Sequence, residues 1–257
     1  MVHWITGVSI FMLGLIMGSF LTVCIHRIPQ GKSVVVPRSK CPSCGVQIVW
    51  YDNIPVWSFL WLRGQCRMCQ QSIPFRYPLI EIVNGLGYLL VVWRFGLAWS
   101  TVIYAGLFSV FLVVTWIDWD HQIIPDLITL PGIVVGVLCA GFWLPTGWGN
   151  SLMGLLVGGG VLLILAWASP FLFGKEGMGG GDIKFLAMVG AFLGWKAALL
   201  ALMIASVVGA CCGVALLLAR VMERGQYIPF GPYLALGSLT AMLWGNEIWT
   251  WYFNGLI

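Results

Sequence analysis

The sequence has few charged residues, and this scarcity argues against a water-soluble globule. Charged residues make up 9% of the 257 residues, whereas a typical soluble domain has about 25%. Hydrophobic residues make up 60% of the chain, and the mean hydropathy is +0.94. We therefore predict a membrane protein, long enough for several spans of about 20 residues each and one small additional unit.

Three further features are missing. The chain has no basic stripe interleaved with aromatic residues on a polar surface, so we expect no nucleic-acid partner. It has no G-x-G-x-x-G motif after a strand, so we expect no Rossmann-type methyltransferase domain. It has no basic segment before the first apolar run and no clear A-x-A site, so we expect that run to stay as a span rather than act as a signal peptide.

Apolar runs of span length recur along the chain and predict an all-α polytopic membrane protein. We expect about eight transmembrane helices, over residues 5–25, 78–95, 100–117, 127–144, 152–173, 183–195, 197–219 and 230–253. Residues 118–126 read as a polar connection and 174–181 as a flexible loop. The last helix has an interruption near Gly231-Pro232. Gly14 and Gly18 permit a close helix contact, although lipid tolerates small residues equally well.

The stretch between the first two spans differs in composition from the rest. It contains prolines, basic residues and four cysteines, and so predicts an insert outside the membrane. We therefore divide the chain into a first transmembrane helix at 1–25, the insert at 26–77 and a membrane core at 78–257.

The basic residues predict the orientation. With the insert in the cytoplasm, 11 of the 13 Lys and Arg fall on the cytoplasmic side and two, Arg94 and Lys196, fall outside. This is the asymmetry of the positive-inside rule. The cytoplasmic residues are Arg27, Lys32, Arg38, Lys40, Arg63, Arg67, Arg76, Lys175, Lys184, Arg220 and Arg224.

Two C-x2-C pairs stand in the insert, separated by 21 residues, and resemble a zinc ribbon. Their four cysteines are Cys41, Cys44, Cys66 and Cys69. Four thiolates complete a tetrahedron and leave no open position, so a zinc ion here would be structural. The alternatives are two disulfides, which a cytoplasmic location disfavours, or four unrelated thiols. The other cysteines lie in apolar runs and are interpreted as packing residues: Cys24, Cys139, Cys211 and Cys212.

Carboxylates are rare, and four of the nine stand in two segments at the ends of apolar runs. Asp118 ends the third run, and Asp182 follows a glycine-rich stretch 64 residues later. A carboxylate at a membrane boundary is costly and indicates function. Two close carboxylates share a proton, so one can activate water while the other protonates the departing amine. We therefore predict an aspartyl protease dyad, with Gly179 and Gly181 giving its loop backbone freedom.

Each acid also has an alternative interpretation. Asp126 follows a proline and precedes an apolar run, which favours a helix N-cap, and spacing alone favours the same for Asp182. Asp118, Asp120, His121 and Asp126 could together bind a cation. An ion- or proton-coupled transporter could use the paired acids, although carboxylates in the middle of a span would suit transport better. A structural subunit of an assembly machine would not require paired acids.

Seven blocks of sequence, in order, resemble the type IV prepilin peptidases, the bifunctional leader peptidase/N-methyltransferases of type IV pilus and type II secretion systems. The resemblance covers nearly the whole chain. The blocks are Gly18-Ser19-Phe20-Leu21 with His26-Arg27-Ile28-Pro29, the cysteine pairs, Asn53-Ile54-Pro55, Arg76-Tyr77-Pro78 with Glu81, Ile117-Asp118 with Ile124-Pro125-Asp126, the stretch 175–182, and the stretch 228–235.

The resemblance implies that Asp118 and Asp182 are the catalytic pair, the latter in the G-x-G-D motif shared with presenilin-like proteases. It implies a multi-pass protein of the bacterial inner membrane. Its substrates would be prepilins or pseudopilins, cut at the cytoplasmic face between Gly and Phe. S-adenosylmethionine would then methylate the new N-terminus, an activity of members with the cysteine insert. Glu81, at the start of the second span, is our candidate for the methyl-donor site. Thr22 departs from the family, where Asn is expected. The sequence does not indicate an oligomeric state.

Overall fold

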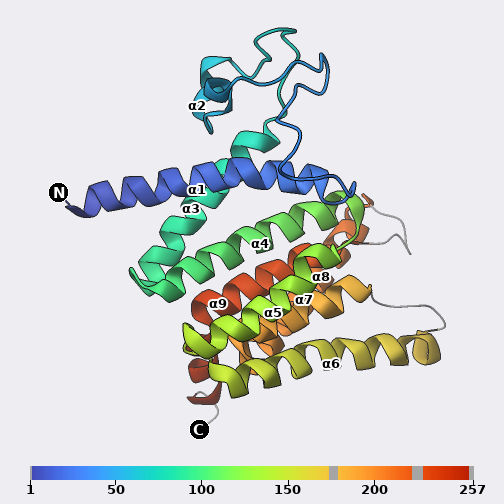
Figure 1. Ribbon diagram of the computed structural model, residues 1–257. Helices are drawn as coiled ribbons and strands as arrows, with labels where there is room; N and C mark the ends of the chain where they lie inside the picture. Colours follow the sequence, from blue (N-terminus) through green and yellow to red (C-terminus); the bar gives the residue numbers. More distant parts are fainter. Residues whose placement is uncertain (1, 174–178, 222–227, 255–257) are drawn as a thin grey trace. The chain divides into compact units, whose positions relative to one another are not determined.

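The computed structural model describes residues 2–173, 179–221 and 228–254 (Figure 1). Residues 175–178 of the glycine-rich block and Arg224 lie outside the described residues. Across these ranges the chain is helical and forms no β-strand, apart from two isolated β-bridges in the insert. The predicted all-α fold class is therefore confirmed.

The described residues form eight long helices, which follow one another in the predicted order (Figure 1). Five of them, α1, α3, α4, α6 and α8, are long and apolar enough to cross a membrane, and α5 is a shorter apolar helix. The chain is thus a multi-pass membrane protein, while the count of eight spans stays a prediction. The helices are α1 (Val2–Arg27), α3 (Arg76–Phe95), α4 (Trp99–His121), α5 (Asp126–Phe142), α6 (Gly147–Phe173), α7 (Gly180–Leu193), α8 (Trp195–Leu218) and α9 (Gly231–Asn254).

Several helix boundaries differ from the prediction, and two of the differences have a clear cause. The helix α4 continues through the expected polar connection as far as His121, because the N–H of Gln122 still donates to the carbonyl of Asp118 at 2.9 Å. Gln122 then takes a positive φ of 54°, a common way to end a helix. The expected interruption near Gly231 is instead the start of α9. Pro232 stands in its first turn, where no backbone N–H is required.

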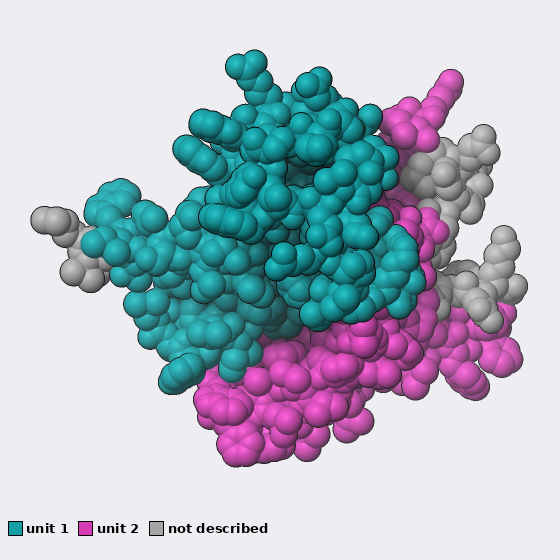
Figure 2. Space-filling view, turned by 45° about the horizontal axis from the view of Figure 1, so that its top comes forward, with its two compact units in different colours: residues 1–113 teal, residues 114–257 magenta. Residues whose placement is uncertain are grey.

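The chain divides into two compact units, coloured separately in Figure 2. Unit 1 covers Met1–Val113 and unit 2 covers Val114–Ile257, so the boundary falls within α4. Unit 1 also holds the insert, with the 3-10 helix η1 (Trp50–Asn53) and the short helix α2 (Trp57–Trp61). The domain boundaries expected from composition stay a prediction.

Unit 1 is built on a close crossing of α1 and α3. A Cβ added to Gly18 would lie 2.7 Å from the Cα of Glu81, and one added to Gly14 would lie 2.7 Å from the Cα of Gly85. The two backbones therefore touch, as the spacing of these glycines allowed. The buried Asn84 donates from Nδ2 to the carbonyl of Gly14 at 2.8 Å. Small residues and such polar bonds hold helices together where lipid offers no hydrophobic drive.

Unit 2 is built around α7. Residues 185–192 of this helix are buried. On one side α6 crosses with Gly154 directly against Gly190, too close for any side chain. On another side Gly136 of α5 lies against the ring of Phe192, where an added Cβ would stand 2.8 Å from Cδ2. These contacts fix the position of α7, and with it the acidic residue in its first turn.

Candidate functional site

Asp118 lies near the end of α4 and is 5% exposed. The N–H of Gly231 donates to its Oδ2 at 2.8 Å. Gly231 begins α9, so this carboxylate faces a helix N-terminus, where free N–H groups and the helix dipole accommodate negative charge. A Cβ on Gly231 would stand 2.7 Å from that oxygen. Sequence reasoning included Gly231 in a family block but assigned it no role.

Asp182 lies in the first turn of α7 and is 6% exposed. The N-cap position is held by Gly179, whose carbonyl accepts from the N–H of Asp182 at 3.2 Å, so the interpretation of Asp182 as an N-cap is wrong. Asp182 is thus buried like Asp118, which stands 64 residues away in the sequence, and both carboxylates belong to unit 2. Their pairing as a dyad stays a prediction.

The glycines beside Asp182 differ in what surrounds them. A Cβ on Gly181 would lie 2.9 Å from the Cβ of Ile124 and 3.2 Å from its backbone N and O, so only glycine fits there. A Cβ on Gly179 would lie 3.4 Å from Oδ2 of Asp182, which is ordinary contact. A Cβ on Gly180 would meet no other described residue within 4 Å, apart from its chain neighbours and the backbone of its own helix. Packing against the segment before α5 thus explains one motif glycine, and open space explains why the middle position can vary.

Asp126 is not the helix cap that its neighbours in sequence suggested. Pro125 holds the N-cap position of α5, and no side chain caps the helix. The carboxylate of Asp126 instead accepts from Nζ of Lys184 at 2.7 Å through both oxygens. This ion pair joins the first turn of α5 to α7, two residues beyond Asp182. Both side chains are partly exposed to the surroundings.

The four cysteines of the insert form one cluster, with all Sγ atoms within 4.8 Å of one another. Sulfurs at the corners of a tetrahedron, each about 2.3 Å from zinc, lie about 3.8 Å apart. The Sγ atoms of Cys41 and Cys69 are 3.8 Å apart. Backbone hydrogen bonds from Cys44 and Ser43 lower the pKa of the Cys41 thiol to about 6, which favours the thiolate that binds a metal. The cluster can therefore hold a metal ion.

The two cysteine turns are copies of one another, a feature that sequence reasoning missed. In the first, the N–H of Gly45 donates to the carbonyl of Cys41 at 2.9 Å. In the second, 25 residues later, the N–H of Gln70 donates to the carbonyl of Cys66 at the same distance. Gly45 and Gln70 have positive φ values of 71° and 55°. In both turns the residue with positive φ directly follows the C-x2-C pair, so the shared spacing in the sequence could have predicted this repeat.

Glu81 has a partner within the insert. Its carboxylate is buried and accepts from the N–H of Val56 at 2.7 Å. Val56 has a positive φ of 59°, which is uncommon for a β-branched residue. Glu81 therefore holds a strained turn of the insert against α3, and its weakly predicted part in methyl-donor binding stays a prediction.

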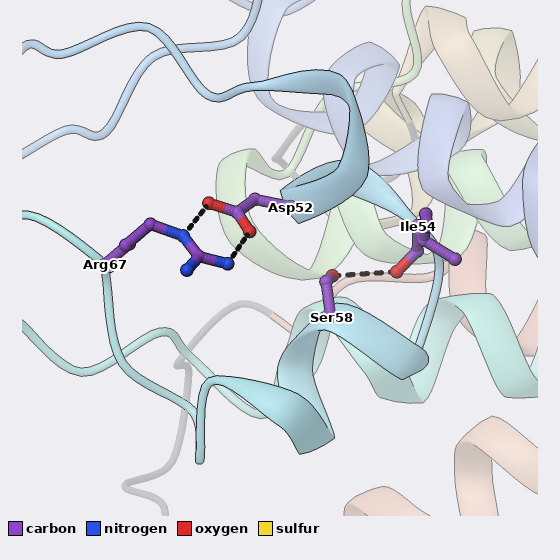
Figure 3. Close-up of polar contacts among 4 residues, drawn as sticks. All are labelled: Asp52, Ile54, Ser58 and Arg67. Carbon is purple, nitrogen blue, oxygen red and sulfur yellow. Dashed lines mark hydrogen bonds and ion pairs between the residues drawn. The ribbon is translucent and has the colours of Figure 1, made fainter.

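Further polar contacts order the insert (Figure 3). Arg67 donates to both carboxylate oxygens of Asp52 at 2.6 and 2.8 Å, and so joins the second cysteine turn to η1. The hydroxyl of Ser58 donates to the carbonyl of Ile54 at 2.7 Å. The insert is therefore an ordered structure and not a loose connection.

Two family models match successive parts of the chain. Residues 12–95 match the profile of the bacterial peptidase A24 N-terminal domain, and residues 105–214 match that of the type IV leader peptidase family. No solved structure matches the chain.

Curated relatives match over most of both chains. A protein of Aeromonas salmonicida (strain A449), named prepilin leader peptidase/N-methyltransferase, is 38% identical over 99% of this chain and 96% of its own. Proteins of the same name from Stutzerimonas stutzeri and Pseudomonas aeruginosa are 40% and 38% identical, each over 92% of this chain and 90% of their own. The resemblance seen in the sequence blocks is thus confirmed, and the chain belongs to the type IV leader peptidase family.

Proposed function

We propose that this chain is a membrane aspartic endopeptidase that removes the leader of type IV prepilins or pseudopilins and methylates the new N-terminus. The observation that supports the peptidase half is that Asp118 and Asp182 are both buried carboxylates of unit 2, Asp118 against the first residue of α9 and Asp182 in the first turn of α7. The shared name of the curated relatives supports both halves.

In the proposed reaction the dyad shares one proton and holds a water molecule. The N–H of Gly231 stabilises negative charge on Oδ2 of Asp118, which therefore takes a proton from water as it attacks the peptide carbonyl. Asp182 gives its proton to the departing nitrogen, so the C–N bond breaks and the proton on Asp118 restores the pair. No covalent intermediate with the protein is required.

The proposed substrate is a basic leader that ends in Gly, followed by Phe and an apolar helix. Such a helix enters sideways from the bilayer, while its leader stays in the cytoplasm. The excess of basic residues on the predicted cytoplasmic side supports an orientation with the dyad and the insert at that face of the inner membrane.

Methylation is proposed to transfer the methyl group of S-adenosylmethionine from sulfur to the amine of the new N-terminal residue, with release of a proton. The four cysteines are proposed to hold a structural zinc ion, because four protein ligands leave no position for a substrate. Zinc would then keep the two cysteine turns together and take no part in the transfer.

One assay tests the proposal. Purified protein is mixed with a prepilin in detergent, with and without S-adenosylmethionine, and the N-terminus of the product is read by mass spectrometry. Asp118→Asn and Asp182→Asn are expected to abolish cleavage while methylation of a precleaved substrate continues. Asp120→Asn is the matched control, because this exposed carboxylate lies two residues further along α4. Cleavage near the wild-type rate in either dyad variant would reject the pair.

A further inference from the structure

The short helix α2 presents an apolar face that the rest of unit 1 leaves uncovered. Trp57, Leu60 and Trp61 are 63%, 66% and 69% exposed, and their spacing places them on one side of the helix. The opposite side points into the insert, where Phe59 meets the ring of Phe75 edge to face. The exposed face is therefore a feature of an ordered helix, not of a loose segment.

The turn directly before this face is bonded to α3 within two turns of its start. Val56, directly before α2, bonds to Glu81, which packs against Gly18. Gly18 stands nine residues before Arg27, the end of α1, and Glu81 stands five residues after Arg76, the start of α3. At 1.5 Å per residue these two backbone positions lie about 13 Å and about 7 Å along their helices from those ends.

Both flanking helices are apolar and long enough to cross a membrane. Their ends at Arg27 and Arg76 therefore lie on the same side of the bilayer. The headgroup region is about 6 Å thick on each side of the hydrocarbon core. A segment bonded to Glu81, five residues after the start of α3, therefore lies near the boundary between headgroups and acyl chains.

The polar contacts of the segment suit this depth. Backbone groups at membrane depth need partners within the protein. The backbone N–H of Val56 donates to the buried carboxylate of Glu81, and the hydroxyl of Ser58 donates to the carbonyl of Ile54. Arg63 follows α2 and is exposed, so its guanidinium can reach lipid phosphates.

We propose that α2 is an interfacial membrane anchor, with Trp57, Leu60 and Trp61 inserted at the boundary between lipid headgroups and acyl chains. Tryptophan is enriched at that boundary, and a neighbouring arginine complements anionic lipid. Composition alone suggested that the insert lies wholly outside the membrane. With this anchor, one part of the insert lies within the membrane interface. The anchor holds the cysteine cluster close to the membrane surface.

The experiment introduces one photoreactive residue into the full chain. Leu60→p-benzoylphenylalanine is compared with Met68→p-benzoylphenylalanine, a position in the second cysteine turn of the same insert that is 68% exposed. Both side chains are exposed, so neither replacement disturbs packing, and gel filtration verifies folding. Each variant is reconstituted in vesicles of phosphatidylethanolamine and phosphatidylglycerol, illuminated, and analysed by mass spectrometry for lipid adducts.

The proposal expects at least tenfold more lipid adduct at position 60 than at position 68. Equal adduct levels at the two positions would overturn it. Adducts at position 60 to a second copy of the chain, or to an added prepilin in place of lipid, would overturn it equally, because they would assign the face to a protein partner. The readout does not depend on either enzymatic activity.

Discussion

Replacing Gly231 by alanine disturbs the proposed dyad at one defined point. The new Cβ would stand 2.7 Å from Oδ2 of Asp118 and 2.9 Å from its Cγ. Ordinary contact begins near 3.4 Å, so the carboxylate has to move by about 0.7 Å. A misplacement of about 1 Å at a reacting group costs on the order of 100-fold in rate, or about 2.7 kcal/mol.

The assay is the rate of prepilin cleavage by Gly231→Ala, expected to fall by about 100-fold. Gly180→Ala is the matched control, because it lies at the start of α7 beside Asp182 and its added Cβ would meet no other residue of the described part within 4 Å. It is expected to cleave at nearly the wild-type rate. Methylation of a precleaved substrate should be unchanged in both variants. Wild-type cleavage by Gly231→Ala would refute the reasoning, and loss of both activities would attribute the effect to folding.

Four further outcomes are expected. Asp126→Lys and Lys184→Asp should each lower kcat/KM for cleavage several-fold by moving the start of α7, and the double variant should recover most of it; no recovery would exclude the ion pair as a positioning device. Thr129→Val removes a buried hydroxyl that has no partner among the described residues, so the free energy of unfolding should rise by about 1 kcal/mol with cleavage unchanged; slower cleavage would give the hydroxyl a part in the reaction. Gln70→Gly relieves a positive φ and should stabilise the insert by roughly 0.5–1 kcal/mol in thermal unfolding, whereas Gly45→Gln should destabilise it; equal effects of the two would contradict this. A chelator should reduce methylation before cleavage, and simultaneous loss of both would count against a structural metal in the insert.

The apolar runs predicted the order of the long helices but not all of their ends. Polarity marks where a segment meets water, whereas a helix ends where its backbone hydrogen bonds end. The two differ at Asp118, which reads as the start of a connection and yet accepts an in-register bond from Gln122. They differ again at Gly231, which reads as a break and is a start.

The residues of the candidate site could be picked out from their rarity, but their partners could not. The sequence around Asp126 does not indicate that its partner is Lys184, which stands 58 residues away. The ion pair between them takes the place of the predicted helix cap. Nothing near Asp118 indicates that the N–H of Gly231, 113 residues away, meets its carboxylate. Such contacts depend on how helices cross, and local pattern carries no information on crossings.

The way α7 is held has a consequence for how a substrate is received. Gly190 lies against the backbone of Gly154 on one flank, and Phe192 fills the space beside Gly136 on the other. A helix gripped at backbone distance can neither slide nor turn without separating its neighbours. If a pilin helix enters this unit from the side, Asp182 keeps its position, and the substrate has to move until its scissile bond reaches that carboxylate.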